Sequence, residues 1–115
     1  FTFLVGPEEF MSEFVLTGGH GGVSGGANMF PKLFVNLYDA AVNRDFDEIV
    51  FLQKKVMQIS TTIYNVGQYG SSYLKGLKCA LSIMGICGDF MAEPFYRFNK
   101  VERKKIEEAL NAMEI

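Results

Sequence analysis

The sequence contains no tryptophan, one histidine and two cysteines among its 115 residues. The two cysteines, Cys79 and Cys87, and the lone His20 cannot supply the four ligands that a structural zinc site needs. No metal is therefore expected. With so few cysteines, reduced thiols in a cytoplasmic protein are the expected state.

An excess of positive charge is also absent. Eleven basic residues stand against 13 acidic ones, which gives a net charge of −2. This balance provides no general attraction to nucleic acid or to an anionic membrane surface. No apolar run approaches the roughly 20 residues of a membrane-spanning helix. Neither nucleic acid nor a membrane is therefore expected as a partner.

Core-forming residues, in contrast, are plentiful. Hydrophobic residues make up 49% of the chain, with 11 phenylalanines and five tyrosines, so a sizeable core can form. A chain of 115 residues is long enough for one domain at most.

Glycine is concentrated in the run 18–26, where the backbone must turn tightly or allow a close approach. Gly21 and Gly26 have the spacing of a phosphate-binding loop, but alanine and asparagine follow in place of Lys and Ser/Thr. A dinucleotide fingerprint fails as well, because Ser24 stands where its third glycine belongs. The run is either a connector between packed elements or the exit of a short strand at the edge of an α/β active site.

Local signals mark most element ends. Pro31 fits the first turn of a helix, Asp45 and Asn99 begin capping-box patterns, and Gly85 is typical of a helix end. The expected elements are a strand at 1–5, a helix at 8–16, a strand at 21–24, a helix at 30–42, a helix at 46–66, a helix from Ser71 or Ser72 to Met84, an irregular stretch at 86–98 and a last helix to about Met113. The expected packing faces are Leu33, Phe34, Leu37, Tyr38 and Ala41 on the fourth of these elements, and Ile49, Leu52, Val56, Ile59, Ile63 and Val66 on the fifth.

The fold class is therefore α/β, with two apolar strands in a β–α–β unit whose strands should be parallel. Parallel sheets are found inside larger α/β folds, buried on both faces. Both strands are expected to pair with strands outside this chain. The first residue, Phe1, likewise suggests a chain entered partway through.

The stretches 5–10 and 21–28, with the proline-started helix that follows, resemble strands seven and eight of the dihydrodipicolinate synthase / N-acetylneuraminate lyase family. The stretches 74–81, 85–86 and 93–95 are similar to the helical C-terminal extension of that family. The resemblance implies a class I pyruvate-dependent aldolase on a (β/α)8 TIM barrel. Residues 1–44 would be its last two β/α units and residues 45–115 the helical extension. A homo-oligomer, dimer or tetramer, and a cytoplasmic location are also implied.

In this family a lysine on strand six forms a Schiff base with pyruvate or a 2-oxo acid, and a tyrosine on strand five moves protons. By resemblance both would lie before Phe1, in the missing N-terminal part of the same barrel. No catalytic residue is then expected in this chain, no cofactor is needed, and the chain alone should be inactive. Lys75 and Lys78, on one helix, fit solvated lysines better than Schiff-base amines.

The resemblance also implies a substrate-binding set at the ends of the two strands. Its members are Gly6, Glu8, Glu9, Val23, Ser24 and Gly25. Glu8 stands where the family usually has aspartate, so its reach toward a substrate differs. Glu8 and Glu9 could instead be solvated acids of a first helical turn. Ser24 has no nearby base, because His20 belongs to a surface loop, so it fits a small lining group better than a nucleophile.

A second hypothesis needs no catalysis at all. Helices dominate the expected elements, so the chain could be a freestanding helical module that binds another protein. This second hypothesis predicts a monomeric chain that melts cooperatively and has no affinity for 2-oxo acids, whereas the first predicts that the chain is part of a protein of roughly 300 residues.

Overall fold

A computed structural model describes all residues from Phe1 to Ile115. The chain divides into two compact units, residues 1–57 and 58–114. This division falls inside a helix and later than residue 44, where the family resemblance places the end of the last β/α unit. The elements are β1 (Leu4–Val5), η1 (Glu8–Phe10), α1 (Met11–Leu16), β2 (Gly21–Gly22), η2 (Gly25–Asn28), α2 (Pro31–Val42), α3 (Phe46–Thr62), η3 (Ile63–Asn65), α4 (Ser72–Ile83) and α5 (Lys100–Ala112), where η marks a 3-10 helix.

In the first unit the two strands pair in parallel, with Leu4 opposite Gly21 and Val5 opposite Gly22. The predicted parallel β–α–β unit is confirmed. The strands are shorter than the predicted 1–5 and 21–24, because each has only the other as a neighbour and nothing extends the ladder on its outer edge. Beyond the paired residues, the His20 N–H donates to the Phe3 carbonyl at 2.9 Å and the Val23 N–H to the Val5 carbonyl at 3.0 Å.

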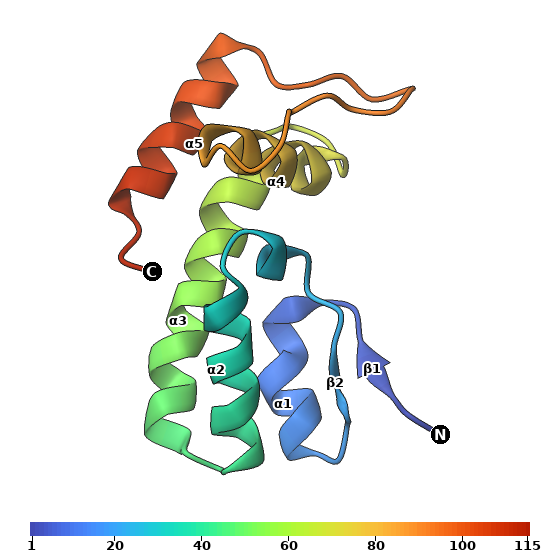
Figure 1. Cartoon of the computed structure of the whole chain (residues 1–115), viewed down its shortest axis with the longest axis vertical. Coiled ribbons are helices and arrows are strands. Elements are labelled where there is room, and N and C mark those ends of the chain that lie inside the picture. The colour runs from blue at the N-terminus through green and yellow to red at the C-terminus, as the bar shows by residue number, and fades with distance from the viewer. The chain divides into compact units, whose positions relative to one another are not determined.

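Helices α1 and α2 pack against each other, and α1 contacts β2 (Figure 1). The predicted helix at 8–16 begins as the 3-10 turn η1 before continuing as α1. Pro31 occupies the first turn of α2, as predicted. The packing face of α2 is also as predicted except for Tyr38, which is 37% exposed because its side chain lines an open cavity beside β2.

Arg44 ends α2 in the left-handed conformation, with φ of +56°. The N–H groups of Arg44 and Asp45 donate to the carbonyls of Ala41 and Ala40, at 3.2 and 2.9 Å. This is the Schellman arrangement, in which glycine usually takes the position of Arg44. The side chain of Asp45 then caps α3 by accepting from the Glu48 N–H at 3.2 Å. The predicted break at this point is confirmed.

The predicted helix at 46–66 is shorter in the structure. α3 ends at Thr62 and the chain tightens into η3. The Thr62 hydroxyl donates to the Gln58 carbonyl at 2.6 Å, a side-chain bond of the kind that disfavours regular helix. The predicted packing face of this helix is buried from Ile49 to Ile63, and Val66 is half-buried beyond it.

In the second unit α4 packs against η3 and α5. Gly85 follows α4 with φ of +76°, and the Ile86 N–H donates back to the Leu81 carbonyl at 2.9 Å, as expected for a glycine helix stop. The capping box of α5 is complete: the Glu102 N–H donates to Asn99 Oδ1, and the Asn99 N–H donates to Glu102 Oε2, each at 3.0 Å. Both helix ends were predicted correctly.

The two cysteines differ in exposure. Cys79 is buried and Cys87 is exposed, and both are free thiols. Burial raises the pKa of the Cys79 thiol, and the nearby Arg103 only partly opposes this. Because the Cys79 side chain is buried and the Cys87 side chain is exposed, Cys79 is expected to react with a thiol reagent at pH 8 at least about tenfold more slowly than Cys87, and its raised pKa acts in the same direction. Mass spectrometry of the native chain checks this, with Cys87→Ser as the matched variant. Equal rates would contradict the packing around Cys79.

Candidate functional site

The six predicted binding residues lie at one edge of the small sheet. Gly6, Glu8 and Glu9 follow β1, and Val23, Ser24 and Gly25 follow β2. The two strands are parallel, so their carboxyl ends meet on the same side. In α/β folds this is the side where ligands bind. The structure therefore brings both groups together, as the spacing of the two motifs required.

Glu8 joins the two groups directly. Its carboxylate Oε2 accepts a hydrogen bond from the Gly26 N–H at 2.7 Å, and the side chain is buried, with the residue only 3% exposed. Gly26 lies in the first turn of η2, where backbone N–H groups have no helical partner and favour a negative charge. Glu8 thus holds the loop after β2 against the loop after β1.

Gly26 is required for this contact and was not among the predicted site residues. A Cβ on Gly26 would lie 2.7 Å from Cζ of Phe34 and 2.8 Å from Oε1 of Glu8. Only glycine leaves room for the carboxylate and the aromatic ring together. The sequence signal was the dense glycine run, but nothing local distinguishes Gly26 from its neighbours.

A second set of hydrogen bonds holds the backbone at Glu9. The Gln53 side chain on α3 donates from Nε2 to the Glu9 carbonyl at 2.7 Å, and its Oε1 accepts from the Ser12 hydroxyl at 3.0 Å. The sequence offered no sign of this, since Gln53 is 44 residues from Glu9. The Glu9 side chain itself is half-buried. The acidic loop is therefore anchored from two sides.

The loop after β2 presents small groups and backbone. Val23 is 69% exposed, while Ser24 and Gly25 are half-buried. Asn28 donates from Nδ2 to the Gly25 carbonyl at 2.9 Å, a hydrogen bond that fixes the loop after β2. Gly6, on the other loop, has open space where a Cβ would stand.

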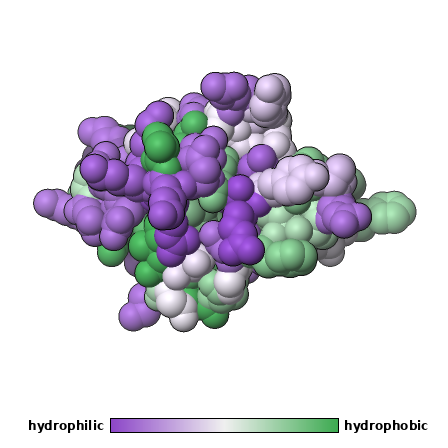
Figure 2. All heavy atoms as spheres, turned by 90° about the horizontal axis from the view of Figure 1, so that it is seen from above, coloured by the Kyte–Doolittle hydropathy of each residue, from purple (hydrophilic) through white to green (hydrophobic).

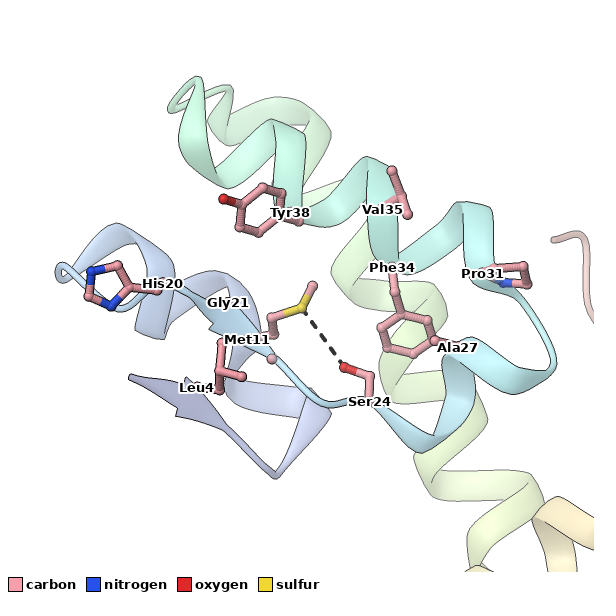
Figure 3. Close-up of a pocket in the computed structure, with 11 residues that line it drawn as sticks. Leu4, Met11, His20, Gly21, Ser24, Ala27, Pro31, Phe34, Val35 and Tyr38 are labelled. Atoms are coloured by element: carbon pink, nitrogen blue, oxygen red, sulfur yellow. Dashed lines mark hydrogen bonds between the residues drawn. The ribbon is translucent and has the colours of Figure 1, made fainter. Parts of the chain in front are cut away.

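Ser24 has no base beside it. Its Oγ makes only a weak contact with Sδ of Met11, at 3.9 Å (Figure 3). His20 is exposed, and its Nδ1 accepts from the Phe3 N–H at 3.0 Å, so this nitrogen is engaged with the backbone. The arrangement supports a lining role for Ser24 and gives no support to a nucleophilic one.

A cavity of about 380 Å³ opens beside β2, between the strand and α2 (Figure 3). Ser24 is the only predicted site residue that lines it. Its walls are mostly apolar and include Leu4, Met11, Phe34, Val35 and Tyr38. The cavity therefore has the character of a packing surface, while the polar groups gather at the neighbouring edge.

The remaining candidates for chemistry lie elsewhere. Lys75, on α4, has its Nζ 5.9 Å from the centre of the Phe98 ring, a cation–π contact. No three His, Cys, Asp or Glu side chains come close enough together to hold a metal ion. No helix is both long and apolar enough to cross a membrane. The edge formed by the two loops carries the carboxylates of Glu8 and Glu9, but it contains no nucleophile with a base beside it.

Comparison with known proteins adds the family. Residues 1–113 match the Dihydrodipicolinate synthetase family. The solved dihydrodipicolinate synthase of Bacteroides thetaiotaomicron is 65% identical and superposes with a TM-score of 0.96 over 98% of this chain. The 4-hydroxy-tetrahydrodipicolinate synthase of Neisseria gonorrhoeae is 29% identical over 97% of this chain. The L-threo-3-deoxy-hexylosonate aldolase of Hypocrea jecorina is 29% identical over 93% of it.

All three relatives are much longer than this chain. The chain spans 38% of the solved Bacteroides structure, 37% of the Neisseria enzyme and 32% of the Hypocrea enzyme. The solved relatives are TIM-barrel proteins, and one small parallel sheet with flanking helices is consistent with part of such a barrel.

Proposed function

We propose that this chain, which belongs to the dihydrodipicolinate synthetase family, supplies the C-terminal part of a Schiff-base lyase. The reaction makes or breaks a bond next to the keto group of pyruvate or of a 2-oxo sugar acid. The observation that carries the proposal is the family match over residues 1–113, together with a parallel strand pair whose outer edges are open.

In this proposal the open edges of the two strands pair with other strands of the same barrel. The outer edge of β1 and the outer edge of β2 each pair with a strand from the N-terminal part of the barrel. The apolar cavity between β2 and α2 is filled by side chains of the strand that joins β2. Exposed apolar residues at the strands, such as Phe3 at 60% and Leu4 at 54%, support this, because a closed barrel would bury them.

Within the assembled barrel this chain binds and orients the substrate. The set Gly6, Glu8, Glu9, Val23, Ser24 and Gly25 forms one wall of the pocket at the carboxyl edge of the strands. The half-buried Glu9 and the open backbone at Gly6 are its accessible polar groups. Glu8 holds this wall in place through its hydrogen bond with the Gly26 N–H.

The covalent step belongs to a lysine outside this chain. Its amine nitrogen attacks the keto carbon, water leaves, and an imine forms that withdraws electrons from the neighbouring carbon–carbon bond. The full enzyme is then roughly 250 residues or more, the usual size of a TIM barrel, and a cytoplasmic homo-oligomer. A freestanding helical module is less well supported, because it does not explain a parallel strand pair with two open edges.

Borohydride trapping tests the proposal. Borohydride reduces an imine between lysine and pyruvate to a stable secondary amine. The polypeptide that carries this lysine then gains mass, which mass spectrometry detects. The 115-residue chain with pyruvate and borohydride is expected to gain no adduct, as is a control without pyruvate. The chain mixed with a polypeptide carrying the preceding β/α units should give an adduct on that polypeptide only. An adduct at Lys75 or Lys78 of this chain would refute the assignment of the lysine to the missing part.

A further inference from the structure

Gln53 is a polar residue on the packing face of α3. The buried Ile49 lies four residues before it and the buried Val56 three residues after it, so all three stand on one side of the helix. Polar side chains normally stand in water, like the many hydrophilic residues on the face drawn in Figure 2. A half-buried amide among apolar neighbours is favourable only if both its donor and its acceptor find partners.

Both partners of the Gln53 amide lie in the segment after β1. Its Nε2 donates to the Glu9 carbonyl at 2.7 Å, and its Oε1 accepts from the Ser12 hydroxyl at 3.0 Å. A carbonyl oxygen can only accept, so the NH2 group of the amide must face Glu9. Ser12 is only 6% exposed, and its hydroxyl holds the other end of the amide. Glutamate would offer only acceptors at these two positions, and methionine would offer neither a donor nor a strong acceptor.

The segment that Gln53 holds carries Glu9 of the proposed pocket wall. Glu9 belongs to η1, a single 3-10 turn of three residues. The bonds of this turn are local, such as the one from the Phe10 N–H to the Pro7 carbonyl at 3.2 Å, and hydrogen-bond geometry in 3-10 turns is poor. The helix α3, in contrast, is 17 residues long. Gln53 therefore ties the backbone of a weak turn to a rigid support.

A carboxylate accepts hydrogen bonds and cannot donate them, so the Glu9 side chain suits a substrate group that donates, either a hydroxyl or an ammonium group. We propose that Gln53 is a positioning residue, which sets the affinity of the assembled enzyme for such a group by holding the backbone of Glu9. The inference rests on the proposed function, in which Glu9 lines the pocket and the Schiff-base lysine lies outside this chain. Gln53 then acts on the binding of a donor-bearing second substrate, and imine formation with pyruvate does not depend on it.

Steady-state kinetics of the full-length enzyme test this role. Pyruvate is held at saturation, and the second substrate is an aldehyde, either glyceraldehyde, which carries hydroxyls, or aminoacetaldehyde, which carries an ammonium group. Gln53→Met keeps a side chain of similar length and removes the donor. It is expected to raise the KM of the aldehyde about fivefold and to leave kcat within about twofold of the wild type. The aldehyde whose KM rises shows whether the group that Glu9 binds is a hydroxyl or an ammonium group.

Three further variants test whether the effect passes through Glu9. Glu9→Ala removes the carboxylate, so adding Gln53→Met to it is expected to raise the KM by less than about twofold more. Ser12→Ala keeps the bond from Gln53 to the Glu9 carbonyl and releases the other end of the amide, so a smaller rise than in Gln53→Met is expected. Gln58→Met is the matched control. It makes the same substitution five residues further along α3, on another side of the helix, and is expected to change neither KM nor kcat.

Trapping with borohydride at saturating pyruvate separates this inference from the proposed function. The wild type and Gln53→Met are expected to form the adduct at the same rate, because the lysine is unaffected. A wild-type enzyme that forms no adduct would refute the proposed function and the inference with it. An intact adduct with an unchanged aldehyde KM in Gln53→Met, or with turnover of neither aldehyde by the wild type, would overturn the inference alone. If adduct yield and kcat fell together in Gln53→Met, Gln53 would support only the fold, and the positioning role would be wrong.

Discussion

Replacing Gly76 by alanine is expected to destabilise the second unit by about 3 kcal/mol, although the change lies in the interior of a helix. In an exposed helix the same change would stabilise, because alanine is favoured over glycine by about 1 kcal/mol. Here a Cβ at position 76 would collide with the backbone carbonyl of Ile63, where α4 crosses η3. The backbone cannot move aside as a flexible side chain can, so the substitution destabilises the unit instead of stabilising it.

Urea denaturation followed by circular dichroism measures this change. Gly88→Ala is the matched control, since a Cβ there meets nothing within 4 Å and the residue belongs to the same unit. The control is expected to shift the unfolding free energy by less than about 0.5 kcal/mol. Should Gly76→Ala prove as stable as the control, α4 and η3 cannot approach as closely as described.

Glu8→Ala is expected to lower the unfolding free energy by about 2–3 kcal/mol, because it leaves the buried Gly26 N–H without its charged acceptor. Glu8→Gln retains an acceptor oxygen and loses only the charge, so about half of that loss is expected. The amide proton of Gly26 provides a local measurement. Its hydrogen exchange should accelerate strongly in Glu8→Ala and mildly in Glu8→Gln.

Glu13→Ala is the control for Glu8. Glu13 is an exposed acid on α1, and its loss is expected to change the stability by no more than about 0.5 kcal/mol. Equal effects of the two alanine variants, with unchanged exchange at Gly26, would show that Glu8 is only a solvated acid of a first helical turn. That alternative reading of the sequence would then stand.

Helix ends were the most predictable part of the fold, because their chemistry is local. Pro31, Gly85 and the Asn99–Glu102 pair each act within one turn of the backbone they terminate. The predicted end of α3 was too late in the chain. The apolar periodicity of the sequence continues through Ile63, whereas the backbone already forms a 3-10 helix there. Strand lengths were overestimated because they depend on neighbouring strands, which local sequence does not describe.

The proximity of the predicted residues at one sheet edge could be predicted from the sequence, but the hydrogen bonds between them could not. Strand ends followed by acidic and glycine-rich loops indicated where the groups gather, and the parallel pairing brings them together. The bond from Glu8 to Gly26 spans 18 residues, and the bond from Gln53 to Glu9 spans 44. Which glycine receives a carboxylate depends on the packing of Phe34, and this is a property of the folded chain.

The long connection between α4 and α5 is tied down by one side chain. Asp89, only 15% exposed, accepts from Arg103 on α5 at 3.3 Å and from Arg97 at 3.5 Å. Arg103 also donates to the Ser82 hydroxyl of α4, at 3.3 Å. A single guanidinium therefore spans both helices and the start of the intervening stretch. Any movement of α4 away from α5 would therefore have to break the bond from Arg103 to Ser82.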